Sequence, residues 1–142
     1  MISFRDATDE DAEALAALLG ELGYPVPAVA VPARLARFRN QSNGRVLLAV
    51  TGHQVVGFAA VEITFPIHLP EPVAHLVVFA VASNFRRRGV GQRLLVAVED
   101  LARATGCHHV VVTSAEHRED AHAFYPSAGW LLTGRRFGKS LH

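Results

Sequence analysis

The stretch "SNFRRRGVGQRLL" (residues 83–95) decides how the fold of this chain is interpreted. Three arginines lead into a Gly-x-Gly pattern formed by Gly89 and Gly91, and an amphipathic helical pattern follows. The apolar run "VAHLVVFAV" (73–81) precedes it and predicts a buried strand. A turn between such a strand and a helix presents free backbone N–H groups, glycine lets an anion approach them closely, and arginine adds positive charge. We therefore expect this turn to bind phosphate, and a pyrophosphate rather than a single phosphate group.

Length and composition predict one globular domain, residues 1–142. Half of the 142 residues are hydrophobic and the formal net charge is +1, which argues against a broad nucleic-acid surface. Cys107 is the only cysteine, so no intrachain disulfide can form, and a reducing cytoplasm is the natural location. No apolar run reaches the ~20 residues of a membrane span, and the acidic start lacks a signal-peptide pattern. We expect a cytoplasmic protein that binds neither membrane nor nucleic acid.

Hydrophobic periodicity predicts elements in the order β-α-α-β-β-β-α-β-α-β, with one or two strands in the tail "WLLTGRRFGKSL". This is an α/β fold with a mixed sheet of about six to seven strands and helices on both faces. "RVLLAVT" and "QVVGFAAVEIT" predict a hairpin, because Gly52 can form the turn between them. The strand at 73–81, the helix after it and a strand at 108–114 predict a right-handed parallel crossover.

Other motifs in the sequence do not support a different ligand. A dinucleotide-binding fingerprint would need a third glycine where Leu94 stands. "GRRFGKS" (134–140) has three residues between its glycines instead of four, and no helix can follow it, so it is not a P-loop. No metal site is expected, because two histidine pairs have spacings that do not suit shared coordination: His108 with His109, and His117 with His122.

The spacing Arg86-x-x-Gly89-x-Gly91 after a buried strand resembles the acyl-CoA-binding motif of the GNAT N-acetyltransferase superfamily, (Gln/Arg)-x-x-Gly-x-(Gly/Ala). "AHAFYPSAGW" (121–130) resembles that family's later signature, Ala-x-x-Phe-Tyr-x-x-x-Gly-(Phe/Tyr/Trp). The opening "ISFRDATDEDAEALAALL" is similar to a common start of its members, so the resemblance covers nearly the entire chain. The sequence departs from the family at two positions: Ser83, where many members have proline, and Arg118, in a region where many have an asparagine that contacts pantetheine.

The resemblance implies a single-domain GNAT-like fold in which acetyl-CoA, as cosubstrate, lies in a V-shaped cleft. Two parallel central strands, 73–81 and 108–114, would splay apart to form it. Edge groups freed by the splay can pair with the amides of the pantetheine arm like an added strand. The implied cofactor-binding residues are Phe79, Ala80 and Val81 in the strand, Arg86, Arg87, Arg88, Gly89, Val90, Gly91 and Gln92 in the turn, and Ser114 and Tyr125.

The implied reaction is direct attack of a primary amine on the thioester, without a covalent enzyme intermediate. By resemblance, the Phe79 N–H would stabilise the thioester oxygen and Tyr125 would protonate the departing thiolate. The base stays open. His75 lies four residues before Phe79, so strand alternation predicts that both face the same side, and the histone-acetylating branch of the family has a glutamate base at the matching position. Glu62 acting through water, a water relay, and an amine that arrives already neutral are the alternatives.

The acceptor cannot be identified from the sequence: a small amine, an amino sugar or aminoglycoside, and a protein amino group all fit, and acyl groups longer than acetyl remain open. We expect the acceptor to enter beside residues 22–31 and the loop "FPIHLPEP" (65–72), where Glu21, Glu62 and Glu71 could attract a cation. A non-catalytic acyl-CoA-binding sensor or interaction module would keep the arginine–glycine turn and lose the acid, so Tyr125 favours an enzyme. A homodimer would cover the edge of a C-terminal strand.

Overall fold

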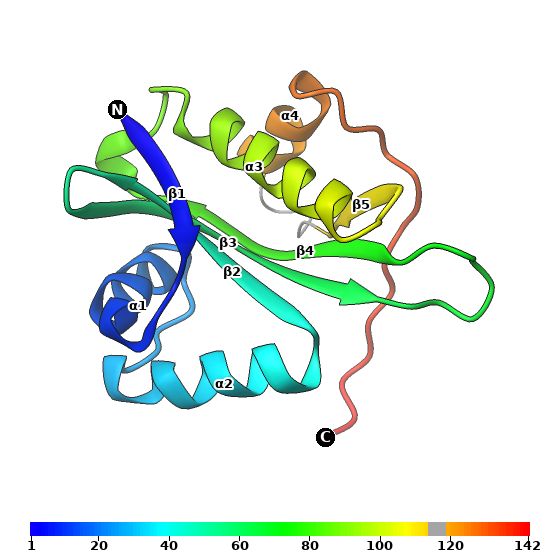
Figure 1. The fold of residues 1–142 in the computed structure, drawn as a ribbon, viewed down its shortest axis with the longest axis horizontal. Coiled ribbons are helices and arrows are strands. Elements are labelled where there is room, and N and C mark those ends of the chain that lie inside the picture. The colour runs from blue at the N-terminus through cyan, green and yellow to red at the C-terminus, as the bar shows by residue number, and fades with distance from the viewer. Residues whose placement is uncertain (114–118) are drawn as a thin grey trace. The chain divides into compact units, whose positions relative to one another are not determined.

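The strands lie side by side in the sheet in the same order as in the sequence. The computed structural model describes residues 1–113 and 119–142 (Figure 1). Its sheet has the order β1-β2-β3-β4-β5, and the first four strands pair antiparallel. The strands are β1 (Ile2–Asp6), β2 (Gly44–Thr51), β3 (Gln54–Thr64), β4 (Val73–Val81) and β5 (His109–Val112).

The chain divides into two compact units, Met1–Val111 and Val112–His142, and each is described by itself. The expectation that residues 1–142 make one domain stays a prediction. No helix among the described residues is long and apolar enough to cross a membrane. The helices are α1 (Ala12–Glu21), α2 (Val31–Gln41), α3 (Val90–Ala104) and α4 (Glu119–Ser127), with 3₁₀ turns η1 (Asp9–Asp11), η2 (Ala28–Ala30) and η3 (Ser83–Phe85).

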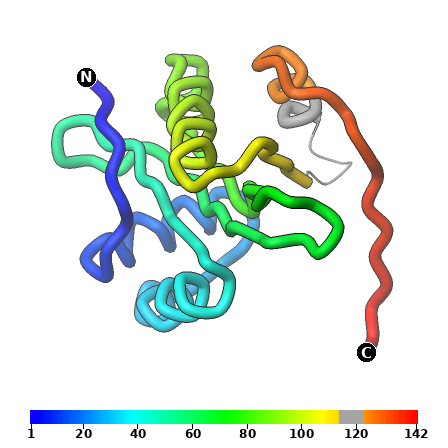
Figure 2. Tube along the Cα trace, turned by 45° about the vertical axis from the view of Figure 1, so that its right-hand side comes forward, coloured from blue at the N-terminus to red at the C-terminus, as the bar shows by residue number. Residues whose placement is uncertain are grey.

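Helices cover both faces of the sheet in the first unit, as predicted. α1 and α2 lie on one side and α3 on the other (Figures 1 and 2). On the α1–α2 side a buried cluster joins the two helices to the sheet, and it includes Leu15, Leu18, Leu35, Val46, Leu48, Val50, Phe58, Ala60 and Ala80. On the other side the inner face of α3 is also buried: Leu94, Leu95 and Val98 are at most 1% exposed. Burial of these two apolar faces holds the sheet between its helices.

The helix and strand boundaries follow the local sequence signals. α2 begins with Pro32 in its first turn, a position where the missing N–H has no helical partner to lose. The β2–β3 hairpin turns at Gly52, whose φ of 60° is the left-handed conformation that glycine adopts without strain. α3 ends shortly before Gly106, with a φ of 84°. The hairpin turn at Gly52 lies where the sequence predicts it.

The C-terminal part of the prediction is wrong in strand number. Residues 130–142 form no strand or helix, and β5 is shorter than the predicted 108–114. A strand needs a neighbour for its backbone N–H and C=O groups, and Leu131, Leu132 and Phe137 are at least 84% exposed instead of packed. The described sheet therefore has five strands, and β5 stands last in it instead of at its centre. Its parallel, splayed relation to β4 remains a prediction.

A buried carboxylate fixes the chain between β1 and α1. Asp11 is 7% exposed and accepts hydrogen bonds from both terminal nitrogens of Arg5, at 2.9 and 2.8 Å. The same carboxylate accepts a bond from the Thr8 backbone N–H at 2.8 Å. The bonds from Arg5, assisted by the one from Thr8, lower the pKa of Asp11 despite its burial. The ionised carboxylate therefore stabilises the folded state.

We predict that Asp11→Asn lowers the free energy of unfolding at pH 7 by about 1–2 kcal/mol, near the lower end for charged hydrogen bonds because Arg5 is half exposed. Since the folded pKa is depressed, the contribution of Asp11 is present above its ordinary pKa and is lost as pH falls through the folded value. Urea unfolding at pH 7 and at pH 3 measures this. A difference between wild type and variant that is as large at pH 3 as at pH 7 would contradict the role of the charge.

Candidate active site

The arginine–glycine turn has the backbone conformation of an anion-binding site. Gly89, the N-cap of α3, has a φ of 78°, and Arg87 two residues earlier also has a positive φ of 65°. A left-handed residue next to a right-handed one turns successive N–H groups the same way, and Gly89 stands next to Val90, the first residue of α3. The N–H groups at this end of α3 have no partners within the helix, which makes them available to an anion. The first turn of α3 holds no acidic residue. Glycine at 89 was predicted; the left-handed Arg87 was not, because no local signal distinguishes it from the neighbouring arginines.

The three arginines of the turn have different surroundings. Arg86 donates from Nε to the carbonyl oxygen of Val81 at 3.2 Å, which ties the turn to the end of β4. The Arg88 guanidinium lies over the ring of Phe85, 5.2 Å from its centroid. Arg87 is exposed and takes part in none of the ion pairs found among the described residues. Arg87 is therefore the side chain of the three that is best placed to meet an added anion.

β3 holds the C-terminal half of β4 in place. Phe79, Ala80 and Val81 pair with consecutive β3 residues, and Val81 lies opposite Gly57. A Cβ added at Gly57 would lie 2.9 Å from the Ala80 carbonyl oxygen, so only glycine lets the two backbones approach this closely. These pairs occupy the β3 edge of β4. A pantetheine arm that pairs with this strand would therefore have to use the opposite edge.

A bulge in β4 overturns the prediction that His75 and Phe79 face the same side. Ala60 pairs with Val78 and the next β3 residue pairs with Leu76, so Val77 is an extra residue in β4. Directly paired residues share a face of the sheet. Phe79 pairs with residue 59 and His75 with residue 62, which are an odd number of steps apart on β3. His75 and Phe79 therefore face opposite sides, with His75 on the face that carries α1 and α2.

The two candidate bases lie side by side. His75 and Glu62 are cross-strand partners, and His75 Nδ1 is 3.2 Å from Glu62 Oε1. Their side chains are 33% and 28% exposed, so the pair is half-buried and still reached by water. An imidazole held by a carboxylate has its ring orientation and tautomer fixed, and the other ring nitrogen, Nε2, can then exchange a proton with a substrate. The sequence presented these residues as alternatives, and the sheet register brings them together.

The predicted acid, Tyr125, belongs to the second unit and is described from its own surroundings. It lies in α4, with its ring centroid 5.3 Å from that of Phe124 and 5.6 Å from that of Trp130. Burial raises the pKa of Tyr125 to about 12, so its phenol stays protonated at neutral pH. Three residues named in the sequence analysis, Ser114, His117 and Arg118, lie outside the described residues.

Glu21 and Glu71, which were expected near the acceptor, already have partners within the protein. Glu21 accepts a hydrogen bond from the Ser83 backbone N–H at 2.9 Å. Glu71 lies 3.4 Å from the Nδ1 atom of His108, which connects the projecting β3–β4 loop to the start of β5 (Figure 2). Among the described residues no group of three or more His, Cys, Asp or Glu is arranged to hold a metal ion.

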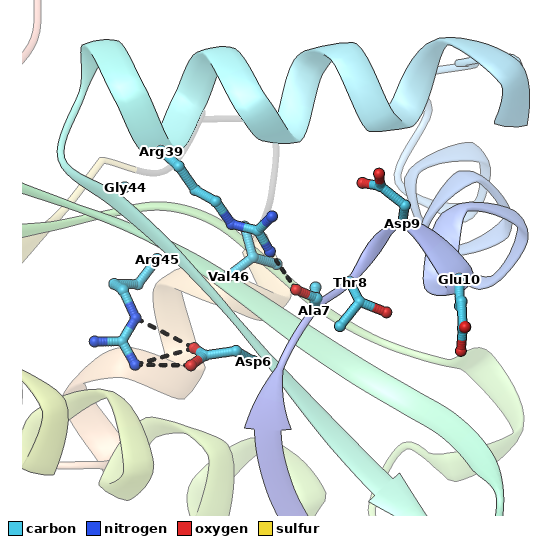
Figure 3. Close-up of a pocket in the computed structure, with 9 residues that line it drawn as sticks. All are labelled: Asp6, Ala7, Thr8, Asp9, Glu10, Arg39, Gly44, Arg45 and Val46. Carbon is cyan, nitrogen blue, oxygen red and sulfur yellow. Dashed lines mark hydrogen bonds and ion pairs between the residues drawn. The ribbon is translucent and has the colours of Figure 1, made fainter.

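A surface cavity of about 830 Å³ lies away from the predicted site residues (Figure 3). It is lined by Asp6, Ala7, Thr8, Asp9, Glu10, Arg39, Gly44, Arg45 and Val46. Its two cations are occupied, because Arg45 pairs with Asp6 at 3.0 Å and Arg39 donates to the Ala7 carbonyl oxygen. These contacts join the end of β1 to β2 and α2, which is a structural role. No motif in the sequence predicts this cavity.

The chain is similar to known acetyltransferases in sequence and in fold. The model of the acetyltransferase (GNAT) family matches residues 11–130. The aminoalkylphosphonate N-acetyltransferase of Salmonella typhimurium is 28% identical, over 96% of this chain and 90% of that protein. A putative acetyltransferase from Agrobacterium tumefaciens has a similar structure, with a TM-score of 0.87 at 22% identity, over 97% of this chain and 99% of that one.

An aminoglycoside acetyltransferase from an uncultured soil metagenomic sample has a TM-score of 0.82 at 20% identity, over 99% of this chain and 97% of that one. At such identities the two structural likenesses show the fold alone. The family match is stronger evidence, because it spans the strand, the arginine–glycine turn and the later signature together. The chain belongs to the GNAT family of acetyltransferases and is an acetyl-CoA-dependent N-acetyltransferase.

Proposed function

We propose that this enzyme transfers the acetyl group of acetyl-CoA directly to the primary amine of a small molecule, with His75 as the base and Glu62 as its partner. The observation that carries the proposal is the 3.2 Å contact between His75 Nδ1 and Glu62 Oε1. The carboxylate would hold the imidazole and stabilise the positive charge that the ring gains when it takes a proton from the amine. The neutral amine then attacks the thioester carbon.

In this proposal the cofactor runs from β4 into the arginine–glycine turn. The pyrophosphate lies against the N–H groups of residues 87–92, where the helix dipole and Arg87 offset its charge. The pantetheine arm pairs with Phe79, Ala80 and Val81. The Phe79 backbone N–H stabilises the thioester oxygen as it gains negative charge, and Tyr125 gives its proton to the departing thiolate. The positive φ values at Arg87 and Gly89 support the first of these assignments.

The bulge in β4 gives the acceptor a side from which to enter. His75 faces the same side of the sheet as α1 and α2, and residues 22–31 connect these two helices. An amine that enters beside this connection meets His75 first and then reaches the thioester, which is bound along β4. A phosphonate-bearing amine is the acceptor class we favour, because the aminoalkylphosphonate enzyme aligns over 96% of this chain.

The proposed reaction is tested by measuring free CoA released from acetyl-CoA in the presence of different amines. The panel contains aminoalkylphosphonates, aminoglycosides, amino sugars and a lysine peptide, with propionyl-CoA as a second donor. We expect the largest kcat/KM with an aminoalkylphosphonate. A higher value with the lysine peptide than with every small amine would contradict the proposed acceptor class.

We predict that His75→Gln lowers kcat/KM by about 10²-fold, as expected for loss of a general base. In wild type kcat/KM should rise with pH through an inflection where the base loses its proton, and His75→Gln should remove that inflection. Glu62→Gln should lower the rate and keep an inflection, displaced toward lower pH, because it removes the carboxylate that stabilises the protonated ring and leaves the base itself. If Glu62→Gln abolishes the inflection while His75→Gln keeps it, Glu62 is the base and the roles proposed here are reversed.

We predict that Tyr125→Phe lowers kcat and kcat/KM together by ~10²-fold, since the phenol acts only in the transition state. Acetyl-CoA affinity and melting temperature should change little, because the ring and its packing remain. With a pKa of about 12, Tyr125 stays protonated throughout the assay range, so its loss should not alter the shape of the pH profile below about pH 10. Unchanged turnover with a raised KM for the amine would make Tyr125 a wall of the acceptor pocket instead.

We predict that Gly57→Ala weakens acetyl-CoA binding, because its methyl group would push β4 outward at Ala80 and shift the strand that holds the cofactor. The expected loss is about ten-fold, measured by calorimetry on folded protein. Gly20→Ala is the matched control, since a methyl group at Gly20 in α1 meets nothing within 4 Å. That variant should bind normally and gain about 0.5–1 kcal/mol of stability from helix propensity. Equal affinity in the two variants would show that the position of β4 does not limit binding.

A further inference from the structure

Glu21 makes a long-range contact that the stability of its own helix does not explain. It stands in the last turn of α1, which contains no basic residue. A negative charge at a helix C-terminus opposes the helix dipole, so Glu21 is unfavourable for α1 itself. Its exposed carboxylate accepts a hydrogen bond from the Ser83 backbone N–H at 2.9 Å, across 62 residues of sequence. This contact joins the start of the acceptor-side connection to the end of β4.

Ser83 lies where β4 leaves the sheet and the arginine–glycine turn begins. Just before it, Ala82 donates its N–H to the Val56 carbonyl oxygen at 2.8 Å, which is the last tie to β3. After it, the Phe85 N–H returns to the Ala82 carbonyl oxygen at 2.9 Å and closes η3. The N–H of Ser83, the first residue of η3, has no partner within that short helix. Glu21 supplies one, and so fixes the direction in which the chain enters the turn.

The contacts after η3 carry this constraint into the turn. The Phe85 ring packs against the core cluster of α1 and α2, and the Arg88 guanidinium lies over the same ring. Arg86 bonds back to the Val81 carbonyl oxygen. Two contacts therefore hold the turn: Phe85 packs against the core beside α1, and Glu21 binds the Ser83 N–H where the chain enters the turn. A change at Glu21 would reach the turn without touching any residue assigned to the cofactor.

We propose that Glu21 is a positioning residue for acetyl-CoA: by holding the Ser83 amide it keeps the arginine–glycine turn in its cofactor-binding conformation. The proposal rests on the proposed location of the cofactor at this turn. For removal of the Glu21 carboxylate, it predicts the opposite change in acetyl-CoA affinity from the one that the loss of charge alone would cause. Removing a carboxylate near a phosphate site should strengthen anion binding by simple electrostatics, whereas removing a positioning contact should weaken it.

The test compares acetyl-CoA affinity by calorimetry in Glu21→Ala and Glu21→Gln. Both variants remove the charge, but Gln keeps an oxygen that can accept the Ser83 hydrogen bond. We expect Glu21→Ala to bind about five-fold more weakly than wild type and Glu21→Gln to bind within about two-fold of it. In assays, Glu21→Ala should raise the KM for acetyl-CoA and leave kcat nearly unchanged. Wild-type affinity in Glu21→Ala, or equal weakening in both variants, would overturn the proposal.

Ser83→Pro shows whether Glu21 acts through the amide. Proline has no N–H, favours the first position of a helix, and suits the extended ψ of 139° at the preceding Ala82. In the Ser83→Pro background, Glu21→Ala should have no further effect on affinity. An equal effect in both backgrounds would overturn the proposed route.

A Gly91→Glu variant separates this inference from the proposed function, because it places an anion against the expected pyrophosphate. Weaker binding by ten-fold or more in Gly91→Glu, together with wild-type affinity in Glu21→Ala, overturns the role of Glu21 and leaves the cofactor site standing. Wild-type affinity in folded Gly91→Glu overturns the location of the cofactor site, and with it the role of Glu21.

Discussion

β3 and β4 approach each other so closely at Gly57 that a methyl group there would lie 2.9 Å from the Ala80 carbonyl oxygen. The candidate site in the first unit depends on this pairing. It fixes the β4 segment that the cofactor is proposed to follow, and it directs the chain out of the sheet toward the arginine–glycine turn. Further along the same pair, one extra residue at Val77 reverses the alternation and directs His75 toward the α1–α2 face. The pairing of β3 with β4 therefore positions both the segment that is proposed to bind the cofactor and the histidine that is proposed to act as the base.

Much of the architecture could be predicted because its signals are local. Continuous apolar runs mark β3 and β4, the 3.6-residue periodicity marks α3, and Gly52 marks the hairpin turn. The glycine turn at the start of α3 was predictable for the same reason, and its role in binding the cofactor stays a prediction. Tyr125 was singled out by the signature around it, and the family match across residues 11–130 agrees with that resemblance and favours an enzyme over a non-catalytic binding module.

The features that could not be predicted depend on register and on contacts between distant residues. A bulge is set by the hydrogen bonds between two strands, so the sequence of β4 alone predicts the regular alternation that places His75 and Phe79 on one side. The Glu62–His75 and Glu21–Ser83 contacts join residues 13 and 62 positions apart, and no local pattern relates them. The apolar residues of the tail suggested one or two strands, but residues 130–142 have no described neighbouring strand, which explains why the predicted strand number was too high.

Amide-resolved NMR during a titration with acetyl-CoA shows whether backbone N–H groups of the arginine–glycine turn bind the phosphates of the cofactor. We expect the largest saturable shifts at residues 87–92 and in the β4 segment 79–81. Desulfo-CoA, which keeps the phosphates, should reproduce the shifts in the turn. Shifts confined to the lining of the cavity between β1 and α2, with the amides of the turn unchanged, would contradict binding of the phosphates at the turn.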